Sequence, residues 1–384
     1  MTTTSSDWPV DNTEHGLLVA LGKSIQHHGL IDRLMQVPVK QKTRTFAPQT
    51  KLIELLSGIM SGMEHLADLN DGPHPIATDS GVARAWGQAG FAHYSSVSRT
   101  PEVCDAQTVA AVEHAIQEFS RPFIDQLVHD PLRRGEPIIY DLDLTGQAVS
   151  ATRRTYPGVA FGWMNDRAKL GYQLARVCLS RPGQERIWLA GFHHSGDTVS
   201  VACVQDLIRA AETQTGIRPR RRPELVQSRI VAQQETISRT QRLLDQQQQR
   251  LTRVQQTHTA LIGKIYHAQA LLKEAISAQK SARLQHQVTS WRRRLPRLDK
   301  QMVTCQRVIA QHQMRLTEQH TALSHLQAWR VQLEHENRTN PDPPAYCEAR
   351  MDAGFASGEN LTWLLEMGYC PNPKAPNAQT TTAL

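Results

Sequence analysis

The 384-residue sequence lacks the features of a disulfide-stabilised, zinc-binding or membrane-spanning protein. Its six cysteines form no C-x-x-C pair and are irregularly spaced, which argues against a zinc site and against a disulfide framework. No apolar run approaches the ~18 residues that a membrane-spanning helix needs. Residues 1–10 have neither the basic segment nor the apolar core of a secretory signal. We therefore expect a cytoplasmic protein with reduced thiols and no membrane partner.

Residues 219–336 also contain few helix-breaking residues and few acidic residues. Beyond Pro223 they contain no glycine except Gly263 and no proline except Pro296. Between positions 218 and 335 there are 21 Lys and Arg against 7 Asp and Glu, a net charge of +14. The rest of the chain holds 22 basic and 29 acidic residues, a net charge of −7. Because the positive charge is concentrated in one segment, we expect that segment to contact a polyanion, most commonly nucleic acid.

The same segment has the apolar spacing of a coiled coil. Apolar residues recur every three or four positions over 251–272 and again over 298–326, and the polar His258 interrupts the first run. An insertion within a domain must return the chain close to its starting point, so we expect an antiparallel hairpin with its turn near Lys280. Pro296 marks either that turn or a kink, and the sequence leaves both open. A solvated or dimer-forming arm without DNA contact is the alternative function.

Residues 14–130 have the helical apolar spacing of a small all-helical domain. Within it, residues 94–100 form a short polar and basic stretch. Hydroxyl side chains and an arginine at a helix start can contact phosphates, which makes Ser96, Ser98 and Arg99 candidate DNA contacts. The alternative is an ordinary helix cap and loop.

Two further blocks, 136–215 and 345–370, change to the short alternating pattern of β-strands. Strands are predicted over 137–145, 158–164, 172–179, 186–191 and 346–351, and helices over 198–213 and 359–367. Ser357 is a suitable N-cap for the last helix, and residues 371–384 read as an irregular tail. The fold class is therefore α/β, with a helical N-terminal domain and a long inserted hairpin.

Acidic residues occur inside two of these strands. Asp141 and Asp143 lie two apart in the first strand and share a face, and Asp352 ends the strand of the second block. A carboxylate in an apolar strand is unfavourable unless it is paired or binds a metal. Carboxylates from strands of one sheet are suitable ligands for Mg²⁺. The alternatives are that Asp141 caps a turn or pairs with Arg153 or Arg154, and that Asp352 is an N-cap.

Five motifs in this order resemble the DDE-type transposases of bacterial insertion sequences. They are Asp141-Leu142-Asp143-Leu144-Thr145-Gly146, then Gly162 with Gly171-Tyr172, His194-Ser195-Gly196-Asp197-Thr198, Arg350-Met351-Asp352-Ala353-Gly354-Phe355, and Leu364 with Gly368-Tyr369. Residues 95–100 resemble the helical DNA-binding region of the same family. The resemblance implies a ribonuclease-H-like core interrupted by the coiled coil, double-stranded DNA (the element ends) as partner, and Mg²⁺ or Mn²⁺ as cofactor.

The resemblance also implies roles for individual residues. Asp143 matches the first metal-binding Asp because Thr145 supplies the hydroxyl residue two positions on, which makes Asp141 the alternative ligand, and Asp352 matches the second. The family's third carboxylate is a Glu on a helix after a further strand. Glu359 and Glu366 are too close to Asp352 to replace it. We therefore expect a truncated, inactive transposase copy, with a non-enzymatic DNA-binding coiled-coil protein as the alternative.

The basic residues that we expect to contact DNA come from several segments. They are Arg99, Arg153, Arg154, Arg220, Arg221, Arg222, Arg292, Arg293 and Arg294, with Arg218 and Arg297 beside them. A homodimer is compatible with the coiled-coil pattern.

Overall fold

The computed structural model describes residues 13–42, 45–150, 156–164, 167–181, 186–274, 277–344 and 346–374. They fall into two compact units. The first unit comprises Met1–Arg134 with Arg181–Leu189 and Thr213–Thr215, and the second comprises Gly135–Ser180, Ala190–Glu212 and Gly216–Leu384. None of the helices in the described ranges is both long enough and apolar enough to cross a membrane.

The first unit is mainly helical, as the sequence predicts for residues 14–130. Its helices are α1 (Gly16–His27), α2 (Leu30–Met35), α3 (Pro48–Met60), α4 (Asp68–Asp71), η1 (Ile76–Thr78), α5 (Ser80–Ala85), α6 (Tyr94–Val97), α7 (Arg99–Glu102) and α8 (Ala106–Arg134). Ile53, Val82, Trp86 and Val97 are fully buried in its core. Helix α8 continues through Pro122 and Pro131.

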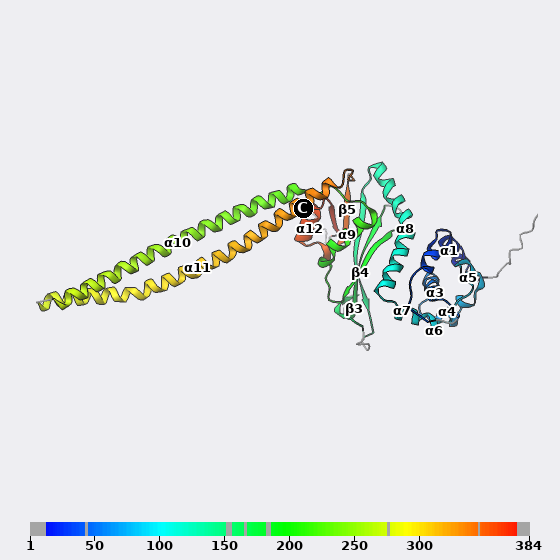
Figure 1. Ribbon diagram of the computed structural model, residues 1–384, viewed down its shortest axis with the longest axis horizontal. Coiled ribbons are helices and arrows are strands. Elements are labelled where there is room, and N and C mark those ends of the chain that lie inside the picture. The colour runs from blue at the N-terminus through cyan, green and yellow to red at the C-terminus, as the bar shows by residue number, and fades with distance from the viewer. Residues whose placement is uncertain are drawn as a thin grey trace, which may run out of the picture. The chain divides into compact units, whose positions relative to one another are not determined.

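The second unit is built on a mixed sheet of six strands. They are β1 (Ile138–Ala148), β2 (Ala160–Met164), β3 (Arg167–Ser180), β4 (Ile187–Ser195), β5 (Cys347–Asp352) and β6 (Cys370–Lys374). The strand order is β2-β3-β1-β5-β6, and β4 also pairs with β3. The β1–β3 and β2–β3 pairs are antiparallel, whereas β1–β5 and β5–β6 are parallel. Figure 1 labels strands β3, β4 and β5 of this sheet. The predicted α/β class is confirmed.

One face of this sheet is apolar and is covered by helix α9 (Val204–Thr215), which follows η2 (Ser200–Cys203). The Tyr369 ring lies 6.0 Å from the Tyr140 ring of β1, and its hydroxyl donates to Glu212 Oε1 of α9 at 2.8 Å. After the long insertion in the sequence, β5 leads through η3 (Ala353–Phe355) to helix α12 (Gly358–Glu366). The predicted N-cap is confirmed, because the Ser357 hydroxyl accepts from the Asn360 N–H at 3.1 Å.

The expectation of an irregular tail from residue 371 is wrong for its first four residues, which belong to strand β6. In the sequence, prolines at 371 and 373 predict against a strand, because proline has no backbone N–H to donate to a neighbouring strand. They are two apart, so both missing donors lie on the same side of the strand, which an edge strand tolerates. Asn372 also fastens β6 to β5, because its Nδ2 donates to Glu348 Oε1 at 2.6 Å. Residues 375–384 lie outside the described residues.

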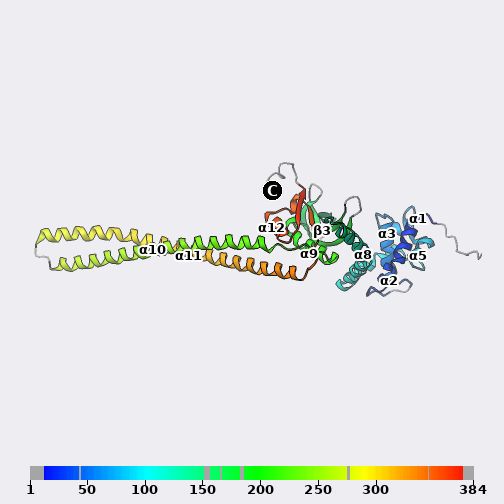
Figure 2. The same ribbon diagram turned by 90° about the horizontal axis from the view of Figure 1, so that it is seen from above.

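The insertion is a hairpin of two long antiparallel helices, α10 (Pro223–Lys273) and α11 (Ala278–Arg338). They lie side by side in both views (Figures 1 and 2). At ~1.5 Å per residue, the 51 residues of α10 span ~77 Å. The turn lies between Lys273 and Ala278, close to the predicted position, and Pro296 lies inside α11.

The two helices bury between them the apolar stripe that the sequence predicts for this insertion. Leu261, Ile265, Ala268 and Val288 form a buried cluster, flanked by partly buried Leu272 and Leu298 among others. The polar exception, His258, finds a partner across the hairpin, since its Nε2 lies 3.1 Å from Asp299 Oδ1. The two helices therefore hold each other through side chains that the spacing identifies.

Candidate functional site

The sheet sets Asp143 beside Asp352. Strands β1 and β5 are parallel neighbours, with Asp141 opposite Arg350 and Leu142 opposite Met351. The next pair in this register is Asp143 and Asp352, at the end of β5. Residues in register on neighbouring parallel strands point to the same face and lie about 4.8 Å apart along the hydrogen-bonding direction. Asp143 and Asp352 therefore lie on neighbouring strands of one mixed sheet.

Asp143 has a cationic partner on its other side. Arg176 of β3 lies directly opposite it. The Arg176 Nε donates to Asp143 Oδ2 at 2.8 Å, and Nη2 donates to the same oxygen. The Thr145 hydroxyl also donates to Oδ2, at 3.1 Å. The side chains of Asp143 and Arg176 are 33% and 37% exposed. Solvent therefore reaches this ion pair, and Asp143 has its charge offset by a guanidinium.

A row of charged residues crosses this face of the sheet. Arg176, Asp143 and Asp352 follow one another across β3, β1 and β5, and residue 374 of β6 lies opposite Asp352. One row away, Arg350 Nε donates to Glu348 Oε1 at 3.0 Å. Burial raises the pKa of Glu348, but hydrogen bonds from Asn372 and Arg350 outweigh it, so the pKa is lowered overall. Arg153 and Arg154, the expected partners of Asp141, lie outside the described residues.

A third carboxylate does not join the pair in the part of the chain that the structure describes. There, no group of three or more His, Cys, Asp or Glu side chains converges. Glu359 lies in the first turn of α12. Glu366, at the end of that helix, accepts from Arg229 Nη1 at 2.6 Å and from Trp329 Nε1 at 2.9 Å. Two carboxylates on rigid strands suit a hard divalent cation, but Arg176 already binds one of them.

The serine-rich stretch of the first unit forms helices α6 and α7. Ser96 and Ser98 are half-buried, and Arg99 is exposed. The Ser98 hydroxyl donates to the Ser95 carbonyl at 3.1 Å, so it also serves the local turn. Of the three predicted contacts, Arg99 presents the most accessible charge.

The arginines at the root of the hairpin differ sharply in exposure. Arg220 and Arg222 are exposed, but Arg221 is only 2% exposed. The Arg218 Nη2 donates to the Thr339 hydroxyl at 2.7 Å and to the Thr339 carbonyl at 3.0 Å. The prediction that Arg221 contacts DNA is wrong, because a buried guanidinium cannot reach a phosphate backbone.

Arg221 instead links the hairpin to the sheet domain. Its Nε donates to Glu336 Oε2 at 2.6 Å, its Nη2 to Glu212 Oε2 at 2.8 Å and its Nη1 to the Met367 carbonyl at 2.9 Å. Arg209 also donates to Glu336, at 3.0 Å. Burial favours the neutral form of Glu336, but the hydrogen bonds from both arginines lower its pKa to about 2. Sequence reasoning missed this cluster, since nothing in the spacing separates Arg221 from its exposed neighbours.

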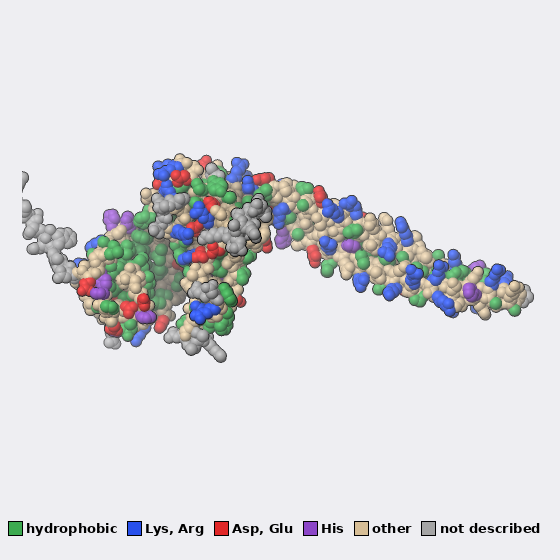
Figure 3. All heavy atoms as spheres, turned by 180° about the vertical axis from the view of Figure 1, so that it is seen from behind, with side chains coloured by type: hydrophobic (Ala, Val, Ile, Leu, Met, Phe, Trp, Pro, Cys, Tyr) green, Lys and Arg blue, Asp and Glu red, His purple; other side chains and the backbone are tan. Residues whose placement is uncertain are grey.

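The distal part of the hairpin carries the strongest positive charge. Residues 246–273 and 277–298 hold ten Lys and Arg and no Asp or Glu. Figure 3 shows Lys and Arg side chains along this arm. Arg292, Arg293 and Arg294 are all exposed, as a DNA contact requires. Arg294 and Arg297 also line a groove of about 500 Å³ with Lys264 of α10. Lys264 was not predicted, although a turn near residue 275 brings it opposite Arg294.

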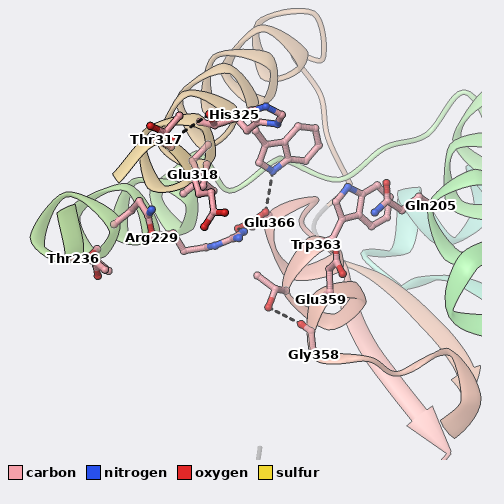
Figure 4. Close-up of a pocket in the computed structure, with 17 residues that line it drawn as sticks. Gln205, Arg229, Thr236, Thr317, Glu318, His325, Gly358, Glu359, Trp363 and Glu366 are labelled. Carbon is pink, nitrogen blue, oxygen red and sulfur yellow. Dashed lines mark hydrogen bonds and ion pairs between the residues drawn. The ribbon is translucent and has the colours of Figure 1, made fainter. Parts of the chain in front are cut away.

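A larger groove, of about 1570 Å³, lies where α10 and α11 pass α12 (Figure 4). Its walls include Trp363 and Glu359 from α12 and Glu318 from α11. Glu366, held by Arg229 and Trp329, forms part of the same lining. These contacts make the groove part of the attachment of the arm to α12.

No protein-family model, curated protein or solved structure matches this chain.

Proposed function

We propose that this chain is a DNA transposase of the DDE type whose metal centre is incomplete in the described residues. The observation that carries the proposal is that Asp143 and Asp352 lie on the neighbouring parallel strands β1 and β5, one step beyond the last paired residues, Leu142 and Met351. Carboxylate oxygens are the ligands that Mg²⁺ and Mn²⁺ prefer. Such an ion, when bound, supplies Lewis-acid polarisation of a phosphoryl oxygen.

The architecture supports a ribonuclease-H-like core. The first strand, β1, carries one candidate ligand and the parallel strand β5 carries the second, as the family resemblance implies. The insertion between α9 and β5 is the hairpin of α10 and α11. Because the buried stripe of this hairpin follows the heptad-like spacing of the sequence, we infer that the hairpin is an antiparallel coiled coil.

The charge distribution supports double-stranded DNA as the partner. On the distal hairpin, residues 246–298, ten basic residues against one acidic residue, Glu274, favour phosphate binding by counterion release. Exposed arginines at 292–294, with Arg99, Arg220 and Arg222, supply the contacts. None of these contacts is aimed by the structure at a particular base, so the binding that they support is largely independent of sequence.

The residues of the metal pair have distinct roles in this proposal. Asp143 and Asp352 would hold the ion, Thr145 orients the Asp143 carboxylate by its hydrogen bond to Oδ2, and Arg176 offsets the Asp143 charge. A two-metal nuclease centre needs more ligands than this pair offers. We therefore expect DNA binding from these residues, and no strand cleavage.

A nicking assay on supercoiled plasmid tests this proposal. In Mg²⁺ or Mn²⁺ the full chain should bind the plasmid without nicking it, and Asp143→Ala should bind at least as well, because the substitution removes a negative charge. Nicking that disappears in Asp143→Ala would show that two carboxylates suffice. Absence of binding even at low salt would remove DNA as the partner.

A non-enzymatic DNA-binding protein is the second candidate, and the Arg176–Asp143 ion pair favours it. In that case Asp143 is a structural partner of Arg176, and Asp352 has no shared ligand with it. Mn²⁺ binding that depends on both aspartates would separate the two candidates, since only the transposase proposal gives Asp143 and Asp352 a common ion.

A further inference from the structure

We propose that the groove between α10 and α11 in the distal hairpin holds one phosphodiester strand of duplex DNA through Lys264, Arg294 and Arg297. This inference rests on the proposed function, because it names the side of the hairpin that DNA occupies. The groove has a volume of about 500 Å³, and α10 contributes Lys264 to it while α11 contributes Arg294 and Arg297. The three cations therefore converge from both helices on one hollow of the surface.

Helical periodicity explains why these side chains converge. On each helix the residues that line the groove are spaced by four and then by three positions, which places them on one side of that helix. They include Thr257, Leu261 and Lys264 on α10, and Arg294, Leu298 and Gln301 on α11. Because the two helices are antiparallel, Lys264 at the end of the first set lies opposite Arg294 at the start of the second.

The apolar stripe between the helices forms the floor of the groove. Leu261 is buried and Leu298 is partly buried in the same cluster, so the groove is built on packed helices and not on a loop. Ala260, also in the lining, extends only a methyl group and leaves the hollow open. The lining advances ~10 Å along each helix, which accommodates about three phosphates of a strand that advances ~3.4 Å per nucleotide.

The positive charge of the groove is not offset in the part of the chain that the structure describes. There, no Asp or Glu lines the groove, and Lys264, Arg294 and Arg297 form no ion pair. Asp299, the acidic residue nearest to Arg297 in the sequence, lies 3.1 Å from His258 Nε2 instead. A phosphate that enters the groove therefore meets cations without having to displace a carboxylate from them.

The larger groove beside α12 does not suit the same ligand. Glu318, Glu359 and Glu366 line it, and its Arg229 already donates to Glu366. Carboxylates repel phosphate oxygens, so the charge of that groove opposes a DNA strand. Of the two grooves along the hairpin, the distal one is the phosphate site.

Helix geometry supplies two matched controls. Arg292 is exposed like Arg294, but two residues at ~100° each turn it about 200° around α11, away from the groove. Lys273 is exposed like Lys264, but it follows nine residues later and lies about 180° around α10. Neither control residue is part of the groove lining.

The first test measures the affinity of the full chain for a 25-base-pair duplex by fluorescence anisotropy at one fixed salt concentration. Arg294→Gln should weaken binding about tenfold, because it removes a charge-assisted hydrogen bond to a phosphate. Arg292→Gln removes the same charge from the same helix and should weaken binding less than about threefold. Both positions are exposed, so circular dichroism should show the helix content of the parent in both variants.

The second test needs no substitution. The full chain is treated with a trace of acetic anhydride, with and without the duplex, and the acetylated lysines are identified by mass spectrometry. Bound duplex should protect Lys264 and leave Lys273 as reactive as it is in the free chain.

The outcomes separate this inference from the proposed function. Equal losses of affinity in Arg294→Gln and Arg292→Gln, or equal protection of Lys264 and Lys273, would overturn the groove and leave DNA binding intact, because DNA would then have no preferred side of the hairpin. Absence of duplex binding by the parent chain even at low salt would overturn the DNA partner and this inference together.

Discussion

At the scale of single residues, burial separates an arginine that stabilises the fold from arginines that are available to a partner. Arg220, Arg221 and Arg222 are adjacent in the sequence, yet only Arg221 is enclosed, between Glu212 and Glu336. A local sequence pattern cannot reveal this, because both carboxylates come from other helices. The strand pattern alone left Asp141 and Asp143 open, and only the family resemblance, through Thr145, favours Asp143 with Asp352 as the metal ligands.

The first prediction concerns Arg221. Arg221→Met should destabilise the second unit by about 3–5 kcal/mol, because it leaves Glu212 and Glu336 buried without their shared partner. Arg220→Met, at the exposed neighbouring position, should change stability by no more than about 0.5 kcal/mol. Urea unfolding followed by circular dichroism measures both. Equal effects of the two substitutions would show that the buried cluster does not stabilise the fold.

The second prediction concerns Glu54, which is buried in the helical unit. Burial raises its pKa from 4.5 to about 7, although the Ala92 N–H donates to Oε2 and Lys51 lies nearby. The folded state therefore binds this proton more tightly than the unfolded state. The free energy of unfolding should fall as pH rises from about 4.5 to 7, and this contribution is lost above pH 7.

Glu54→Gln tests this sign. Glutamine keeps an oxygen for the Ala92 N–H but carries no charge, so the variant should exceed the parent in stability by about 1–3 kcal/mol at pH 8. At pH 5 the two should be nearly equal. Urea denaturation at both pH values measures the difference. A stability gain that is the same at pH 5 and pH 8 would contradict the raised pKa.

At the scale of elements, helices with a long periodic apolar pattern were predictable from the sequence, whereas short elements with unusual residues were not. The hairpin, its turn and its buried stripe follow from apolar spacing over many residues, so one proline or one histidine does not disturb them. Strand β6 was missed because two prolines in five residues outweigh its pattern, and only its edge position makes them tolerable. Buried Ile124 and Val128 sustain helix α8 past Pro122.

The third prediction concerns the length of the arm. Deleting residues 246–308 and joining the ends with a short Gly-Ser turn should leave the fold of both units intact. It keeps Arg229, Trp329 and the Arg221 cluster, which attach the hairpin to α12 and α9. Joining 218 to 340 instead removes Arg221 and Glu336, so that Glu212 loses its buried guanidinium partner, and that variant should unfold. Thermal melts compare the two, and equal stability would contradict the anchoring role of the cluster.

At the scale of the whole molecule, the α/β class and the adjacency of the two aspartates were predictable from sequence. The Arg176 ion pair and the Arg221 cluster were not, because each depends on which distant segments the fold brings together. The proposal of a transposase rests on the order of the motifs and on the pairing of strands β1 and β5. The remaining proposal is that the positive charge of the hairpin binds DNA, and it is tested on the whole molecule.

The most direct test of that claim is a salt titration of affinity for a 25-base-pair duplex, measured by fluorescence anisotropy with the parent chain and with Arg292→Gln/Arg293→Gln/Arg294→Gln. These three side chains are exposed and lie on α11 away from the anchoring contacts, so the variant should fold normally. The parent should bind more weakly as salt rises, and the variant should have a shallower log–log slope, by about 1 for each lost phosphate contact. Binding by the parent that is insensitive to salt, or identical slopes for the two proteins, would contradict the account.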